Sequence, residues 1–230
     1  MTVSKRQIDK LGERLKAGNT TELDLRELDE YRRSFGEPYQ KVAAVIRHHL
    51  RLEPTGREAK STQSVIEKLR RESVRLTQIQ DIAGYRIVVP IVSAQDEVAS
   101  SLRNIFPDVS VIDRRTAPSH GYRALHVVVR VSDKPIEVQV RTELQHQWAE
   151  LSEKLSDVRD KSIKYGGGDG ESRALLDLMS LAVTGHEQME TTIRALPEGG
   201  QKATLMTQYN ERRARLLEFL ARLRTQVGPK

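Results

Sequence analysis

The hydrophobic residues of this chain repeat at helical spacing near both ends and occur in short β-branched runs in the middle. Helices are predicted over residues 22–35, 39–50 and 61–73, where apolar positions recur every three or four residues. From Thr142 the helical spacing returns and continues through two further predicted helices. The last of them carries an apolar stripe over residues 216–227, and such a stripe usually packs inside its own protein.

The middle of the chain contains predicted strands, because runs rich in β-branched residues are bounded there by turn residues. A helix over 94–105 separates the first two strands, Ser-Asp-Lys-Pro between the last two predicts a hairpin, and Pro-Thr-Gly at 54–56 predicts a turn. The pattern predicts an α+β fold with a mixed or antiparallel sheet of about four to five strands flanked by helices. The strands are Tyr85–Val89, Val109–Ile112, Ala124–Val131 and Ile136–Arg141.

The composition excludes several kinds of site, and it does not decide whether the protein binds an anionic partner. Lys and Arg total 38 against 32 Asp and Glu, a formal charge of +6, which either an anionic partner or an ordinary solvated surface explains. The chain has no cysteine, which excludes disulfides, thiolate metal sites and a cysteine nucleophile and fits a cytoplasmic protein. Neither a signal peptide nor a membrane-spanning segment is expected, because the first residues are charged throughout and the apolar runs are short.

A row of basic residues follows the Pro-Thr-Gly turn. At 100° per residue its members fall within one narrow sector of a helix. A polyphosphate lying along the row would relieve the repulsion between the cations. A solvated basic face paired with Glu67 and Glu72 explains the row as well, and the pattern alone favours this second explanation. The row consists of Lys60, Ser64, Lys68 and Arg71.

The predicted hairpin has one face of polar side chains. On the last strand, alternation puts Glu137, Gln139 and Arg141 on one side and branched apolar residues on the other. The partner strand can place His126 beside this row. A hairpin with one solvated face is common, yet a carboxylate beside Gln, Arg and His also makes a surface suited to a metal and a nucleotide.

A second carboxylate, Asp81, precedes the first predicted strand. A carboxylate in this place is a normal capping residue, and it is also a frequent position for a magnesium ligand. Two oxygen ligands from separate segments, completed by substrate phosphates and water, are what Mg²⁺ usually takes. A zinc site is not expected, because the histidines lack the spacing of zinc ligands.

These segments together resemble the synthetase domain of the RelA/SpoT family, the enzymes that make the alarmone (p)ppGpp. The resemblance implies a nucleotidyltransferase-like pyrophosphokinase core at 51–160 between helical extensions at 1–50 and 161–230. It looks like a stand-alone small alarmone synthetase, because no hydrolase domain with metal-binding histidines is recognisable. The four motifs that carry it are Arg57…Lys60-Ser-Thr-Gln-Ser64-Val-Ile-Glu-Lys68, Gln80-Asp-Ile-Ala-Gly-Tyr-Arg86, Gly121-Tyr-Arg-Ala-Leu-His126, and Glu137-Val-Gln-Val-Arg-Thr142 followed by Trp148.

The resemblance implies transfer of the β,γ-pyrophosphate of ATP to a ribose 3′-hydroxyl. Asp81 and Glu137 would bind Mg²⁺, and Glu137 would also accept the proton of the attacking hydroxyl. The adenine of ATP would lie between Arg57 and Arg86. The ATP phosphates would be held by Lys60, Ser64, Lys68 and Arg71, and the acceptor by Tyr122, Arg123, His126, Gln139 and Arg141.

The chain departs from the family pattern in two places. Arg57 stands three residues before Lys60, where the family usually has two. Guanine-nucleotide synthetases commonly have Lys-Pro-Asn-Gly before the stacking tyrosine, and here Ala-Pro-Ser-His-Gly stands before Tyr122. The lysine expected to reach the acceptor phosphate is therefore missing, unless Arg114 or Arg115 replaces it.

The acceptor therefore stays open between GDP or GTP and the 3′-terminal adenosine of tRNA. A toxic branch of the family modifies tRNA, and the altered loop and the charge of +6 are compatible with that branch. On that alternative a neutralising antitoxin protein is an expected partner. A non-catalytic nucleotide- or RNA-binding module on the same fold is the competing interpretation, and the presence of both Asp81 and Glu137 argues against it.

Overall fold

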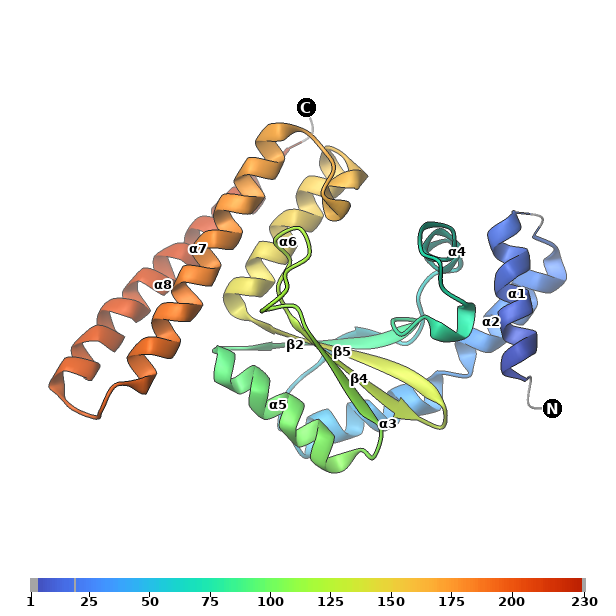
Figure 1. Ribbon diagram of the computed structural model, residues 1–230, viewed down its shortest axis with the longest axis horizontal. Helices are drawn as coiled ribbons and strands as arrows, with labels where there is room; N and C mark the ends of the chain where they lie inside the picture. The colour runs from blue at the N-terminus through green and yellow to red at the C-terminus, as the bar shows by residue number, and fades with distance from the viewer. Residues whose placement is uncertain (1–3, 19, 229–230) are drawn as a thin grey trace. The chain divides into compact units, whose positions relative to one another are not determined.

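The computed structural model describes residues 4–18 and 20–228, and it contains a mixed five-stranded sheet with flanking helices (Figure 1). This confirms the predicted fold class. The strand order is β1-β2-β5-β4-β3, and β1 pairs antiparallel with β2. The strands are β1 (Thr55–Arg57), β2 (Ala83–Val89), β3 (Val109–Asp113), β4 (Leu125–Val131) and β5 (Lys134–Thr142).

The helices begin at the polar residues that the sequence offers as caps. Ser61, Thr142 and Asp169 each accept a hydrogen bond from a backbone N–H in the first turn of the helix that follows, which satisfies a donor without a partner inside that helix. The helices are α1 (Lys5–Ala17), α2 (Glu22–Arg33), α3 (Gly36–His48), α4 (Thr62–Arg71), α5 (Val92–Ile105), α6 (Glu143–Val158), α7 (Gly170–Ala195) and α8 (Gly200–Gln226), with 3₁₀ turns at Leu76–Gln78 and Lys161–Tyr165.

The prediction of a turn at residues 54–56 is wrong, because Thr55–Arg57 form β1. Thr55 lies opposite Arg86 and Arg57 lies opposite Gly84 on the neighbouring strand. Pro and Gly disfavour a strand as isolated residues, but hydrogen bonding to the edge of β2 outweighs that local preference.

The predicted hairpin joins β4 and β5, with a shorter connection than the sequence suggested. Its two turn residues, Ser132 and Asp133, have φ of 49° and 63°. Positive φ at both central residues is what a type I′ turn requires, and this turn matches the twist of the flanking strands. Lys134 and Pro135 therefore belong to β5.

The chain forms two compact units, each assembled from separate segments. The first contains Met1–Ile87, Val98–Val111 and His126–Gln139. The second contains Val88–Glu97, Ile112–Leu125 and Val140–Lys230. In the first unit α1, α2 and α4 pack together, and in the second α6, α7 and α8 do so (Figure 1). The three-part division at residues 50 and 160 stays a prediction.

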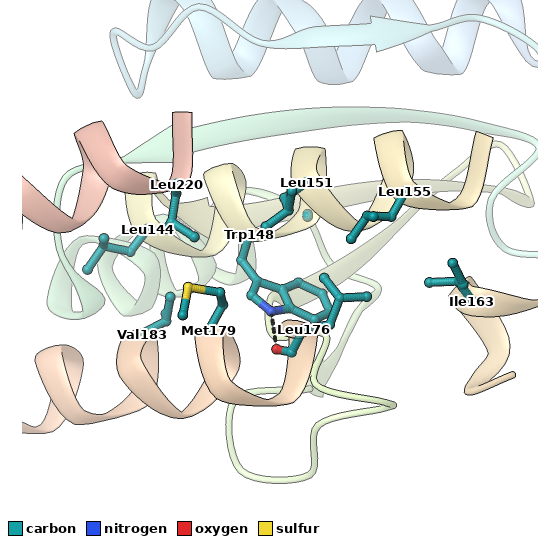
Figure 2. Packing of buried hydrophobic residues seen from close by; sticks show 10 residues of the cluster. Leu144, Trp148, Leu151, Leu155, Ile163, Leu176, Met179, Val183 and Leu220 are labelled. Atoms are coloured by element: carbon teal, nitrogen blue, oxygen red, sulfur yellow. Dashed lines mark hydrogen bonds between the residues drawn. The ribbon is translucent and has the colours of Figure 1, made fainter. Parts of the chain in front are cut away.

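The core of the second unit explains the apolar stripe near the C-terminus. Figure 2 shows Trp148 between α6 and α7, where its Nε1 donates a hydrogen bond to the Leu176 carbonyl at 2.9 Å. Leu220 is buried in this core, and Leu216, Leu223 and Val227 pack against it. The stripe is therefore part of the protein's own interior. Of the helices in the described ranges, none is both long enough and apolar enough to cross a bilayer.

Candidate active site

Asp81 lies at the centre of a group of charged residues in the first unit. Lys60 Nζ donates to Asp81 Oδ2 at 2.7 Å, and Lys68 Nζ donates to Asp81 Oδ1 at 2.9 Å. Lys60 is held from the backbone as well, because its N–H donates to the Ile82 carbonyl at 2.6 Å. The carboxylate and both ammonium groups are largely buried, with about a fifth or less of each side chain exposed.

The two lysines keep Asp81 ionised. Burial opposes its charge and would raise its pKa, but the charges and hydrogen bonds of Lys60 and Lys68 outweigh burial and lower the pKa to about 2. Asp81 is thus a carboxylate at neutral pH, as a metal ligand must be.

The basic row does not lie entirely on one helix. Ser61 is the N-cap of α4, so Lys60 precedes the helix and reaches Asp81 from the chain that leads into it. Further along α4, Ser64 accepts a hydrogen bond from Ser61 Oγ at 2.8 Å, and Arg71 lies 3.0 Å from Glu72. At the end of the row Arg71 is therefore paired with Glu72 of the same segment, as the solvated-face explanation expected. Lys60 and Lys68 are instead paired with Asp81.

Glu137 is the second carboxylate of the first unit, and it projects from β5 as the alternation predicted. His126 Nδ1 lies 2.8 Å from Glu137 Oε1, and Gln139 Nε2 donates to Glu137 Oε2 at 2.8 Å. Burial acts to raise the pKa of Glu137, but the hydrogen bonds and charge of His126 and the bond from Gln139 lower it overall. The negative charge of Asp81 opposes this lowering.

Gly84 allows β2 to approach Glu137 closely. A Cβ atom on Gly84 would lie 2.6 Å from the Glu137 carbonyl oxygen and 3.4 Å from the Glu137 Cβ. The first distance is shorter than any normal contact, so a side chain at this position would push the two strands apart. The glycine between Asp81 and Arg86 is therefore explained by the position of Glu137.

Arg57 and Arg86 come from neighbouring strands and lie on the same side of the sheet. Arg57 is directly opposite Gly84, so Arg86, two residues further along β2, is its diagonal neighbour. Diagonal neighbours are roughly 7–8 Å apart, a separation that admits one flat ring between two side chains. This register supports the predicted adenine site.

The first unit satisfies the chemistry of a magnesium site with its own oxygen ligands. Asp81 and Glu137 come from separate segments, both are ionised, and Mg²⁺ takes further ligands from phosphates and water. A cluster of three or more His, Asp or Glu that would hold a metal alone does not occur among the described residues. Asp81 and Glu137 thus fit a magnesium ion whose remaining ligands are phosphate oxygens and water.

The second unit contains two of the predicted acceptor residues in contact. Arg141 Nη2 donates to the Tyr122 hydroxyl at 3.2 Å, and the Arg141 guanidinium carbon lies 5.1 Å from the centre of the Tyr122 ring. Arg141 is buried, and Tyr122 is half-buried against the Trp148 core. The ring of Tyr122 is thereby fixed in position.

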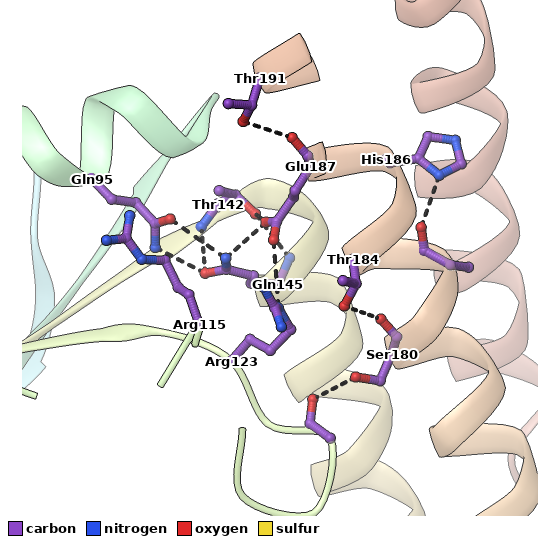
Figure 3. Close-up of polar contacts among 12 residues, drawn as sticks. Gln95, Arg115, Arg123, Thr142, Gln145, Ser180, Thr184, His186, Glu187 and Thr191 are labelled. Carbon is purple, nitrogen blue, oxygen red and sulfur yellow. Dashed lines mark hydrogen bonds and ion pairs between the residues drawn. The ribbon is translucent and has the colours of Figure 1, made fainter. Parts of the chain in front are cut away.

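Glu187 on α7 was not predicted from the sequence. Its carboxylate lies 3.6 Å from Arg123 and accepts hydrogen bonds from Thr142 and Gln145 (Figure 3). The sequence does contain a signal, because Glu187 and Glu190 occupy the helical positions after Met179 and Val183 that would normally be apolar. A carboxylate on the buried face of a helix needs a buried partner.

Known proteins are similar in sequence to large parts of this chain. A model of the region found in RelA and SpoT proteins matches residues 56–160. GTP pyrophosphokinase YjbM of Bacillus subtilis is 32% identical over 167 residues, which cover 65% of this chain and 74% of that protein. An uncharacterized protein of Mycobacterium tuberculosis is 38% identical over 111 residues, but the chain spans only 41% of its length.

A solved structure agrees in fold. The crystal structure of small alarmone synthetase 1 from Bacillus subtilis matches with a TM-score of 0.54 and 26% identity, over 74% of this chain and 94% of that chain. The family model's region, residues 56–160, contains all four motifs. The mixed sheet with flanking helices is the fold of that solved structure. The chain therefore belongs to the RelA/SpoT family and resembles its small alarmone synthetases.

Proposed function

We propose that this protein is a pyrophosphokinase that transfers the β,γ-pyrophosphate of ATP to a ribose 3′-hydroxyl. The observation that carries the proposal is the pair of ionised carboxylates, Asp81 and Glu137, whose charges act on each other, with two lysines bound to Asp81. A nucleotide-binding module needs cations for the phosphates but has no need of two acidic metal ligands. Relatives named GTP pyrophosphokinase support the same activity.

The chain's own side chains supply positioning, charge and a proton acceptor. Lys60, Lys68 and Arg71 hold the ATP phosphates, and Arg57 and Arg86 hold the adenine. The 3′-oxygen of the acceptor attacks the β-phosphorus, the bond from that phosphorus to the oxygen bridging to the α-phosphorus breaks, and AMP leaves with the electron pair. The proton of the hydroxyl passes to Glu137.

Mg²⁺ held by Asp81 and Glu137 would neutralise charge on the transferred group. The two side chains that contact Glu137 orient its carboxylate for this reaction. His126 and Gln139 fix its two oxygens, so that the carboxylate faces the incoming hydroxyl in one orientation. Tyr122 and Arg141 of the second unit are the proposed contacts to the acceptor.

The acceptor is either a guanine nucleotide or the 3′ end of tRNA, and the loop before Tyr122 bears on the choice. Arg115 is held by Asp113 and Asp96, each at 2.7 Å, which argues against Arg115 as the replacement for the missing loop lysine. Arg114 is exposed and could do so. The names of the relatives favour GDP or GTP, whereas the missing lysine favours tRNA. With tRNA, toxicity and a neutralising partner protein would follow, and either acceptor places the activity in the cytoplasm.

The decisive experiment follows both transferred phosphates. ATP labelled at the β-phosphate and, in parallel, at the γ-phosphate is incubated with the protein, MgCl₂, and GDP, GTP or tRNA. Both labels should appear on the same acceptor as AMP is released. The matched control is each acceptor with a 3′-deoxyribose, which should yield no labelled product. Failure to release AMP with any acceptor, together with ATP binding that is independent of magnesium, would establish the non-catalytic alternative.

A further inference from the structure

The loop that presents Tyr122 is a tight turn. Tyr122 N–H donates to the Ser119 carbonyl at 2.9 Å, and Ser119 N–H donates to the Tyr122 carbonyl at 3.3 Å. Between them His120 and Gly121 have φ of 51° and 82°. A positive φ is uncommon for a residue with a side chain, so this conformation needs support from its surroundings.

Helices α6 and α7 provide part of that support. Ser180 Oγ on α7 donates to the Gly121 carbonyl at 2.9 Å. A Cβ atom on Gly121 would lie 2.9 Å from the Trp148 ring and 3.2 Å from the Ser180 Cβ. The turn is therefore pressed against both helices with no room for a side chain.

Arg123, the residue after Tyr122, is held by the same helix. Arg123 Nε lies 3.6 Å from Glu187 Oε2, with 14% of the arginine side chain and 5% of the glutamate side chain exposed. Because both groups are nearly removed from water, their mutual attraction is screened far less than that of a surface ion pair. The chain on one side of Tyr122 is thus fixed by Ser180 and on the other side by Glu187.

Glu187 also holds the segment that carries Arg141. Its Oε1 accepts hydrogen bonds from Thr142 Oγ1 at 2.8 Å and from Gln145 Nε2 at 2.7 Å, and Gln145 is in turn bonded to Gln95. Thr142 directly follows Arg141. One carboxylate therefore joins the two segments whose side chains, Tyr122 and Arg141, contact each other.

Among these contacts, only the one with Arg123 needs Glu187 to carry a negative charge. Thr142 and Gln145 both donate to Oε1, and the amide oxygen of a glutamine would accept these two hydrogen bonds equally well. Burial and the charge of Glu190 raise the pKa of Glu187, while Thr142, Arg123 and Gln145 act in the opposite direction, so the charge of Arg123 favours the carboxylate form. Arg123 is the cation that lies against the second oxygen.

We propose that Glu187 is a positioning residue of the acceptor site, which fixes Arg123 and through it the orientation of Tyr122. This inference rests on the proposed function. Arg123 is then also a positioning residue rather than a direct contact to the acceptor, because its guanidinium lies against Glu187 on α7.

The test uses Glu187→Gln in the full chain, with Glu190→Gln as the matched control. Glu187→Gln keeps the size of the side chain and an acceptor for Thr142 and Gln145 but removes the charge opposite Arg123. Glu190 is an equally buried carboxylate one turn further along α7, bonded to Arg194 and Tyr209 instead. Glu187→Gln should raise the KM for whichever of GDP or tRNA supports turnover by about tenfold and leave the KM for ATP unchanged. Glu190→Gln should change neither constant.

Two further measurements separate positioning from general loosening. Arg123→Gln should raise the same KM, and the double variant should be no worse than the worse single variant, because the two side chains act as one pair. Amide hydrogen exchange at residues 119–123 should accelerate in Glu187→Gln and stay at the wild-type rate in Glu190→Gln.

The outcomes are distinct for the two proposals. An unchanged acceptor KM in Glu187→Gln, or an equal effect in Glu190→Gln, overturns the positioning role. If the wild-type chain transfers pyrophosphate to no acceptor, the proposed function has failed, and the exchange rates alone then decide whether Glu187 orders the Tyr122 loop.

Discussion

Lys60 Nζ and Asp81 Oδ2 lie 2.7 Å apart, and this contact joins a proposed phosphate ligand directly to a proposed metal ligand. Lys68 makes the same connection through the other carboxylate oxygen. Binding of Mg-ATP would replace these ion pairs with contacts from lysine to phosphate and from carboxylate to metal. Since charges are exchanged rather than newly buried, the residues are prepared for a ligand that carries both a cation and an anion.

The two carboxylates should be indispensable for turnover. Asp81→Asn and Glu137→Gln keep the shape of each side chain but remove its charge, and each should lower kcat at least about 100-fold, the usual cost of losing a main electrostatic contribution. The rate of AMP release at saturating ATP and acceptor, measured over a range of MgCl₂ concentrations, checks this. Near-normal kcat in either variant would show that the metal assignment is wrong.

Asp81 should also make the stability of the protein depend on pH. Its pKa falls from the ordinary 3.8 to about 2 on folding, so its contribution is fully present above about pH 4 and is lost as the pH falls towards 2. The shift corresponds to about 2 kcal/mol. The free energy of unfolding from urea titrations should therefore be about 2 kcal/mol higher for the wild type than for Asp81→Asn at pH 6, and the two should converge near pH 2.

The control for this titration is Asp177→Asn, because Asp177 is exposed on α7. Its difference from the wild type should be small at every pH. A gap between the wild type and Asp81→Asn that persists unchanged at pH 2 would mean that the lysines stabilise the fold by some route other than the charge of Asp81.

Arg114 decides whether a guanine nucleotide can be held without the loop lysine. If GDP is the acceptor, Arg114→Ala should raise its KM about tenfold or more, as expected for losing one hydrogen bond between charged groups. Arg103→Ala, which removes an exposed arginine from α5, should leave the KM for GDP unchanged. Equal KM values for GDP in all three proteins would remove Arg114 from the acceptor site.

The basic surface of α8 tests the tRNA alternative. Arg213 is unsuitable for this purpose, because it is bonded to Glu143 and to the Pro90 carbonyl and its loss would disturb packing. Arg212 and Arg215 are exposed, so the double change to Gln should weaken tRNA use and reduce the slope of log KM against log salt by about one to two. The KM for GDP should not change. A tRNA slope identical to that of the wild type would exclude this face from tRNA binding.

Features fixed by local periodicity were predicted well from the sequence. Two-residue alternation placed His126 beside Glu137, and helical spacing identified the stripe that packs around Leu220 as interior. The resemblance also singled out Asp81 and Glu137, whose charges act on each other in the structure. Their roles in catalysis stay a prediction.

Features that depend on distant partners were missed. Thr55–Arg57 forms a strand only because it pairs with the edge of β2. Lys60 contacts Asp81 from the segment that precedes α4, not from the helix itself. Arg115 looked available in the sequence and is held by Asp96 instead. Glu187 finds Thr142 at a separation of 45 residues, which no local pattern encodes.

The bond from Ser180 to the Gly121 carbonyl spans 59 residues and has a consequence for biosynthesis. A ribosome makes the Tyr122 turn before it makes α7, so the nascent turn lacks the Ser180 contact until the intervening chain has emerged. Contacts of such long range close slowly, because the entropy of the loop is lost before the contact is gained. A fragment ending at residue 160 would keep every motif of the matched region. It would nevertheless keep only Trp148 of α6 against the Tyr122 turn and would lose the contacts that Ser180 and Glu187 make from α7.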